Sequence, residues 1–95
     1  MLEKTIEKYL RTKMKAAGHM PFKFVSPAQR HVPDQLILLR DSSGGVFVEV
    51  KQEKGRLTPG QKLMHEQIIH HGYPVYVVWS KEDVDRLVER LEMSE

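Results

Sequence analysis

The stretch VPDQLILLRDSSGGVFVEVK, residues 32–51, contains two strand-like runs, 35–40 and 46–51, separated by the turn-rich DSSGG. Together they predict a β-hairpin. Asp34 stands at the start of the first run, and Glu49 and Lys51 stand inside the second. Charged groups in a β-rich core are costly unless something pairs them. These three residues therefore need a structural or a chemical explanation.

Side-chain alternation places Glu49 and Lys51 on one face of their strand, because successive strand residues point to opposite faces. With a four-residue loop at 41–44, Asp34 lies opposite Lys51 and shares that face. Carboxylate oxygens are the ligands that Mg²⁺ and Mn²⁺ prefer, and a neighbouring lysine can hold an attacking water. The hairpin therefore predicts a metal-assisted site. Glu49 and Lys51 alone are better explained as a surface ion pair on an edge strand.

The rest of the chain predicts an α/β fold. Apolar residues at helical spacing, a Thr-Pro helix start and a second capping signal at Ser80 predict helices, and two further apolar runs predict strands. The helices are expected over residues 2–17, 58–71 and from 80 onwards, and the strands over 22–26 and 73–79. The order of helix, three strands, helix, strand, helix predicts a mixed β-sheet flanked by helices. Residues 1–95 are expected to form one domain.

Composition excludes several classes of protein. The chain has no cysteine, so it has neither disulfides nor thiolate zinc sites. It has no apolar run near the ~20 residues that span a bilayer, and its first residues lack a signal-peptide pattern. We therefore expect a cytoplasmic protein that is not secreted and has no membrane association. The net charge of +2 allows a polyanionic partner without requiring one.

The motifs VPD, VEVK and LTPGQ, in this order and spacing, resemble those of the PD-(D/E)XK nuclease superfamily. More narrowly, the chain is similar to the VRR-NUC domain, the virus-type replication and repair nuclease module. That module occurs as stand-alone phage proteins and at the C-terminus of the Fanconi-anaemia-associated nuclease. The resemblance covers nearly the whole chain and implies a restriction-endonuclease-like fold. One departure is His31, because the residues before the Pro-Asp usually include a glycine.

The resemblance implies a catalytic centre in the hairpin. Asp34 and Glu49 would be the metal ligands for Mg²⁺ or Mn²⁺, and the carbonyl of Val50 would contribute a further oxygen. Lys51 would be the catalytic lysine.

Two helices would add residues to this centre. Glu3 matches the acid of the first helix, which supports the metal directly or through water, and Glu7 is the alternative for that role. Gln61 matches the glutamine of the following helix. Thr58-x-x-Gln61 is also a capping-box pattern, so the glutamine could instead bond the helix N-terminus.

The implied activity is metal-dependent endonuclease cleavage of DNA. Without a separate reading module, the expected substrate is branched or Holliday-junction DNA, cut with little base specificity by a homodimer in a bacterial or phage-infected cell. The alternative is a non-catalytic DNA-binding or assembly module on the same fold. Phosphate contacts are expected from Lys4, Lys8, Lys54, Arg56 and Lys62.

The histidine-rich segment HEQIIHH, residues 65–71, does not predict a zinc site. The H-E-x-x-H pattern requires a histidine where Ile69 stands. His70 and His71 are expected at the last turn of the helix, where imidazoles suit the helix dipole. Trp79 is expected either to fill the core or to stack on a base.

Overall fold

The structure, a computed structural model, describes residues 1–93. Its helices and strands follow the expected order along the chain. They are α1 (Glu3–Ala16), β1 (Met20–Lys23), β2 (Gln35–Leu38), β3 (Gly45–Val50), α2 (Pro59–His70), β4 (Val75–Val78) and α3 (Lys81–Met93). The predicted α/β architecture is confirmed, and the element boundaries differ by a few residues.

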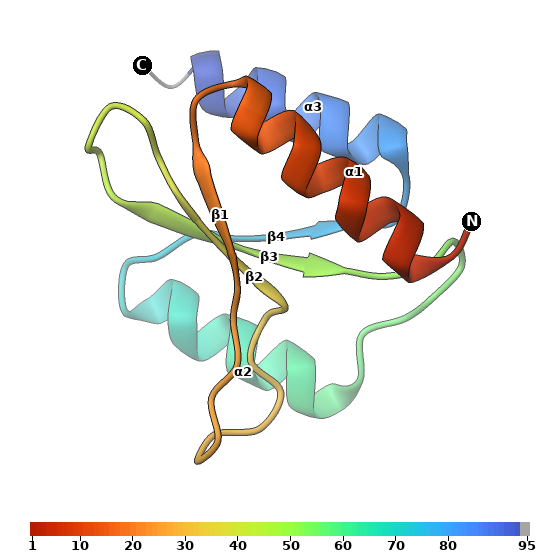
Figure 1. The fold of residues 1–95 in the computed structure, drawn as a ribbon. Helices are drawn as coiled ribbons and strands as arrows, with labels where there is room; N and C mark the ends of the chain where they lie inside the picture. The colour runs from red at the N-terminus through yellow and green to blue at the C-terminus, as the bar shows by residue number, and fades with distance from the viewer. Residues whose placement is uncertain (94–95) are drawn as a thin grey trace.

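The four strands form one mixed sheet in the order β1-β2-β3-β4. β1 with β2 and β2 with β3 are antiparallel, and β3 with β4 is parallel. The parallel pair requires a crossover, and α2 supplies it. Helices α1 and α3 lie on one face of the sheet, and α2 lies on the other (Figure 1). The end of β3 therefore has helices on both sides.

The apolar core lies between the sheet and the pair α1–α3. Residues spaced at i, i+4 and i+8 on α1 and at i, i+3 and i+7 on α3 meet alternate residues of the central strands. The buried apolar residues are Ile6, Leu10, Met14, Ile37, Val46, Val48, Val50, Val78, Val84, Leu87 and Leu91. Burying each such side chain contributes about 1.5–3 kcal/mol of transfer free energy, so this layer holds the sheet in place. By contrast, α2 buries only His65 among its residues.

The register of the β2–β3 hairpin differs from the prediction. Gln35 pairs with Val48, so the pairing extended by one residue sets Asp34 opposite Glu49 rather than opposite Lys51. The shift is two residues, and it therefore keeps Asp34 on the predicted face of the sheet.

The reason for the shift is the position of the turn. The N–H of Leu39 donates to the carbonyl of Gly44 at 2.8 Å, so the four-residue loop is 40–43 and not 41–44. Within it, Asp41 Oδ1 accepts from the N–H of Ser43 at 2.9 Å, and Ser42 has φ of 63°. An Asx-type turn begun by Asp41 thus places the loop one residue earlier.

Two further strands differ from the prediction in their residue range or their place in the sheet. The first strand occupies Met20–Lys23 rather than 22–26, because the chain turns away after the N–H of Phe24 donates to the carbonyl of Asp34 at 2.8 Å. The apolar run 73–79 forms an edge strand, Val75–Val78, in which only Val78 is buried. Helices cover both faces of the sheet, and this explains why β4 is apolar although it lies at the edge.

The loop between β1 and β2 contains His31 in the left-handed region, with φ of 67°. Glycine adopts this conformation without strain, whereas other residues do so at a cost. A Cβ at Gly60 would lie 2.7 Å from His31 Nε2, so the imidazole rests on the first turn of α2. The position at which the family usually has a glycine therefore has a glycine-like backbone in this chain.

In the part of the chain that the structure describes, none of the helices is both long enough and apolar enough to span a membrane.

Candidate active site

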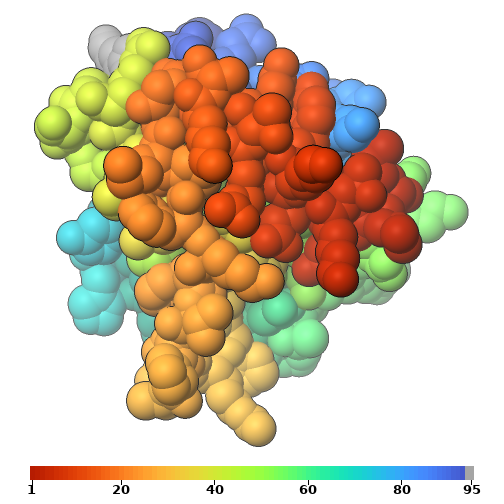
Figure 2. Space-filling model, in the orientation of Figure 1, coloured from red at the N-terminus to blue at the C-terminus, as the bar shows by residue number. Residues whose placement is uncertain are grey.

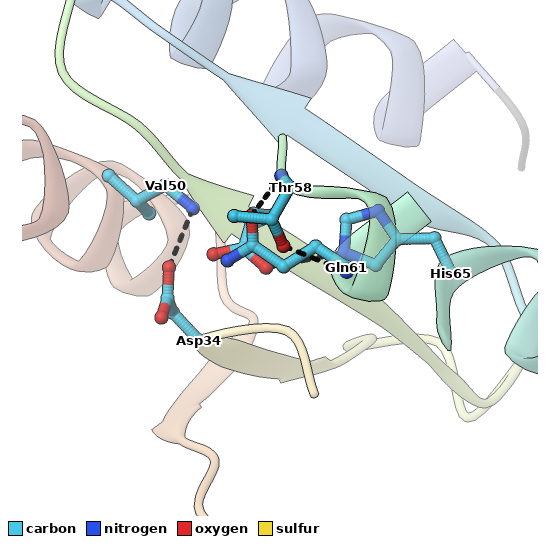
Figure 3. A network of polar contacts seen from close by, with 6 residues as sticks. Asp34, Val50, Thr58, Gln61 and His65 are labelled. Carbon is cyan, nitrogen blue, oxygen red and sulfur yellow. Dashed lines mark hydrogen bonds and ion pairs between the residues drawn. The ribbon is translucent and has the colours of Figure 1, made fainter. Parts of the chain in front are cut away.

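Asp34 directly precedes β2, and hydrogen bonds to the chain on both sides of β2 hold it in place. Its carbonyl accepts from the N–H of Phe24, and its Oδ2 accepts from the N–H of Val50 at 3.0 Å (Figure 3). The second bond crosses to the last residue of β3. The carboxylate is thereby fixed at the end of the hairpin, beside the strand that carries Glu49.

Glu49 points to the α2 face of the sheet and is only 2% exposed. Its Oε1 lies 3.2 Å from His65 Nε2. Burial, followed by the hydrogen bond and charge of Asp34, raises the pKa of Glu49 from 4.5 to about 9, against the opposing charge of Lys51. Two carboxyl groups thus share a small volume, which is unfavourable while both are ionised and no cation is present.

His65 is a site residue that the sequence analysis did not identify. It is 6% exposed, and burial lowers its pKa, followed by the charge of Lys51, against an opposing effect of Asp34. In the sequence, His65 follows Gln61 by four residues, and this helical spacing puts both side chains on one side of α2 (Figure 3).

Lys51 follows β3 directly, and its N–H donates to the carbonyl of Val78 at 2.9 Å. Its charge lowers the pKa of both Glu49 and His65. The ammonium group therefore acts on the same cluster as Asp34, as side-chain alternation had predicted.

The two acids of α1 occupy different environments. The charge of Glu3 contributes to the raised pKa of Glu49. Glu7 Oε1 accepts from Gln35 Nε2 at 3.1 Å and lies 4.0 Å from Lys23 Nζ. Of the two candidates, Glu3 is therefore the one whose charge acts on the site, and Glu7 is bonded to the first residue of β2.

Gln61 forms the predicted capping box with Thr58. Gln61 Oε1 accepts from the N–H of Thr58 at 3.0 Å, and Thr58 Oγ1 accepts from the N–H of Gln61 at 3.1 Å (Figure 3). The carbonyl oxygen of the side chain is thus engaged by the helix start. Gln61 Nε2 is the group left for a role at the site.

The basic residues expected to contact phosphate fall on two surfaces. Lys54, Arg56 and Lys62 are exposed on the loop after β3 and the start of α2. Trp79 Nε1 donates to the carbonyl of Gly55 at 2.7 Å, so the indole anchors this loop rather than standing free to stack. Lys4 and Lys8 are exposed on α1 and line a separate groove.

The site suits a hard divalent cation with few protein ligands. Among residues 1–93, no three His, Asp or Glu side chains gather as a metal cage by themselves. Magnesium sites of nucleotide-processing proteins commonly use one or two carboxylates and complete their shell with water and substrate phosphate. Asp34 and Glu49 are such a pair, and their mutual repulsion is the interaction that a cation would relieve. The residues present therefore fit Mg²⁺ or Mn²⁺.

Comparison with known proteins gives a consistent family assignment. Residues 12–82 match the family model of the VRR-NUC domain. The chain is 36% identical over 80 residues to the candidate nuclease p44 of Acyrthosiphon pisum secondary endosymbiont phage 1, covering 84% of this chain and 85% of that protein. A solved structure of a VRR-NUC domain superposes with a TM-score of 0.85 and 33% identity, covering 92% of this chain and 94% of the other.

Proposed function

Because this chain belongs to the VRR-NUC family of nuclease domains, we propose that it is a divalent-metal-dependent DNA endonuclease, with residues 1–95 as a single nuclease domain. The observation that carries the proposal is the meeting of Asp34, Glu49 and Lys51 at the end of β3. The charges of Asp34 and Lys51 both act on the buried carboxyl of Glu49. A fold that only bound DNA would not need two acids and a lysine held together.

Asp34 and Glu49 would hold the metal, with the carbonyl of Val50 as a further oxygen and Glu3 as a more distant acid. Bound Mg²⁺ or Mn²⁺ would polarise the scissile phosphate and offset the charge that develops on it. Asp34 is oriented for this task by its bond to the N–H of Val50 at 3.0 Å. Oε1 of Glu49 is in contact with His65 Nε2, so Oε2 would be the oxygen that binds the metal.

Lys51 would hold the attacking water and stabilise negative charge on the phosphoryl oxygens. Its position directly after β3, and the effect of its charge on the carboxyl of Glu49, support this role. Gln61 would use Nε2 to orient the water or the phosphate, because its Oε1 is engaged by Thr58.

The substrate is proposed to be branched or Holliday-junction DNA in the cytoplasm of a bacterial or phage-infected cell. Exposed Lys54, Arg56 and Lys62 beside the site would contact phosphates, which position DNA without reading its sequence. Contacts of this kind to the phosphate backbone give little base specificity. A two-fold homodimer would match the symmetry of a four-way junction with one site for each of two strands.

A plasmid nicking assay tests the proposal. Supercoiled and cruciform-containing plasmids are incubated with purified protein in Mg²⁺, in Mn²⁺ and in chelator, and the mass of the protein is measured by light scattering. We expect cleavage of the cruciform plasmid with either ion and none with chelator, by a protein of dimer mass. Binding of junctions without cleavage under any divalent ion would instead establish the non-catalytic alternative.

A further inference from the structure

A groove of about 500 Å³ runs along α1 beside β1, on a different surface from the loop that follows β3. Figure 2 shows α1 in red and orange next to the orange chain that leads into β1. Five cationic side chains line the groove: Lys4, Lys8, Arg11, Lys15 and Lys23. Only Lys4 and Lys8 of these were expected to contact phosphate.

The spacing of the cations makes a continuous tract. Positions 4, 8, 11 and 15 recur at helical periodicity, so their side chains leave one side of α1. At 1.5 Å per residue the tract extends about 16 Å along the helix axis. This length matches several consecutive phosphates of one DNA strand.

The single acid in the groove does little to neutralise it. Glu7 Oε1 accepts from Gln35 Nε2 at 3.1 Å and lies 4.0 Å from Lys23 Nζ, so it is turned toward the sheet. Five cations therefore face one carboxylate. A surface with this imbalance attracts a polyanion.

Arg11 brings a guanidinium group to the lining of the groove, between Lys8 and Lys15 along α1. Phosphate oxygens suit guanidinium donors because the bond is charge-assisted.

The groove leads to the candidate active site. Gln35, which holds Glu7, directly follows Asp34 and pairs with Lys23 in the sheet. At the same end of α1, the N-terminal ammonium lies 3.6 Å from Glu53 Oε2, in the loop after β3. A strand lying in the groove would therefore arrive beside Asp34.

The size and lining of the groove indicate how DNA would occupy it. A volume of about 500 Å³ accommodates one sugar-phosphate backbone over part of its length. The lining contains no aromatic side chain on which a base could stack. The contacts would be made to the backbone and would be independent of sequence.

We propose, building on the nuclease function above, that the α1 groove binds the backbone of an unpaired DNA strand that continues from the cleavage site. The groove would thus contribute to the preference for branched DNA, because a blunt duplex offers no single strand to enter it.

Equilibrium binding in chelator tests this, because it measures affinity without cleavage. Fluorescence anisotropy is recorded across a salt series for a duplex with a single-stranded arm and for a blunt duplex of equal length. The test variant is Lys8→Ala/Lys15→Ala. Lys13→Ala is the matched control, because Lys13 leaves α1 on another side, with Nζ 5.6 Å from the ring centre of Tyr9. Thermal melts confirm that each variant is folded.

For the armed duplex, we expect the slope of log Kd against log salt to fall by roughly 0.7 for each lysine removed from the groove. The blunt duplex should show no change in slope with this variant, and Lys13→Ala should leave both substrates unchanged. An equal loss on both substrates, or no loss on the armed duplex, would overturn the assignment of the groove.

The result is separable from the nuclease proposal. A wild-type protein that cleaves plasmid while the groove variant binds the armed duplex normally would overturn only the groove. A protein that never cleaves, but whose groove variant loses the armed duplex selectively, would support the groove and overturn the endonuclease activity.

Discussion

Glu49 and His65 meet inside the protein, with Oε1 of the acid 3.2 Å from Nε2 of the imidazole. Both side chains are nearly inaccessible, at 2% and 6% exposure. One comes from the central strand β3 and the other from α2, which buries no other residue. This contact therefore joins the helix on the second face of the sheet to the carboxylate proposed to bind metal.

The stability of the metal-free protein should fall as pH rises from 6.5 to 9. Folded Glu49 binds its proton more tightly than in the unfolded chain, because burial raises its pKa from 4.5 to about 9. This contribution is complete below pH 4.5 and is lost as pH approaches 9. The expected slope is of order 1 kcal/mol per pH unit, measured by urea denaturation in chelator.

The pH window avoids an opposing effect of His65. Its pKa is lowered from 6.5, so its contribution is present above pH 6.5 and is lost only as pH falls below that value. Glu49→Gln should abolish the decline above pH 6.5, and added Mg²⁺ should reduce it in the wild-type protein alone. A wild-type stability that stays constant or rises over this window would show that Glu49 titrates normally.

Replacement of His65 by alanine should destabilise the fold. The substitution leaves a buried carboxyl without its partner, which costs about 1–3 kcal/mol. His70→Ala is the matched control, because His70 is an exposed residue at the last turn of the same helix. Urea denaturation at pH 7 distinguishes the two. Equal small effects in both variants would mean that the Glu49–His65 contact contributes nothing to stability.

A comparison of Gln61 and Thr58 variants distinguishes the two possible roles of Gln61, in the capping box and at the site. Thr58→Ala removes the side-chain acceptor of the capping box and should cost about 1 kcal/mol with little change in cleavage rate. Gln61→Glu retains a capping-box residue but removes the Nε2 donor. We expect this variant to remain folded and to cleave more slowly under single-turnover conditions. Wild-type cleavage by Gln61→Glu would restrict Gln61 to its capping role.

The backbone at His31 predicts a stability difference between two variants. Alanine and glycine at this position both remove the imidazole that rests on Gly60. Only alanine keeps the cost of a φ of 67°, so His31→Gly should be more stable than His31→Ala by about 1 kcal/mol. Thermal denaturation of the pair measures this. Equal stability would indicate that the loop relaxes to another conformation.

Much of the hairpin could be predicted from the sequence because strand alternation is strict. It placed Glu49 and Lys51 together and brought Asp34 to the same face. The residue opposite Asp34 could not be predicted, because it depends on which residue starts the turn. The side chain of Asp41 makes that choice by bonding the N–H of Ser43, and the pattern DSSGG permits either loop.

Contacts between distant segments were the least predictable part of the site. The capping pattern of Thr58 and Gln61 is local in the sequence. Both the capping role and the site role of Gln61 could therefore be predicted. The approach of His65 to Glu49 depends on how closely α2 packs on the sheet, which no local pattern specifies. The same holds for Glu3, whose charge reaches Glu49 only through the docking of α1.

Asp34, Glu49 and Lys51 are proposed to form the phosphodiester-cleaving centre of this protein. The most direct measurement compares single-turnover cleavage of a four-way junction in Mg²⁺ by wild-type protein, Lys51→Ala and the control Lys13→Ala. Junction binding of each is measured in parallel in Ca²⁺. We predict that Lys51→Ala binds the junction as wild type does and cleaves it at least ~100-fold more slowly, as for loss of one electrostatic catalytic group, while Lys13→Ala cleaves normally. Cleavage by Lys51→Ala at the wild-type rate would contradict the account.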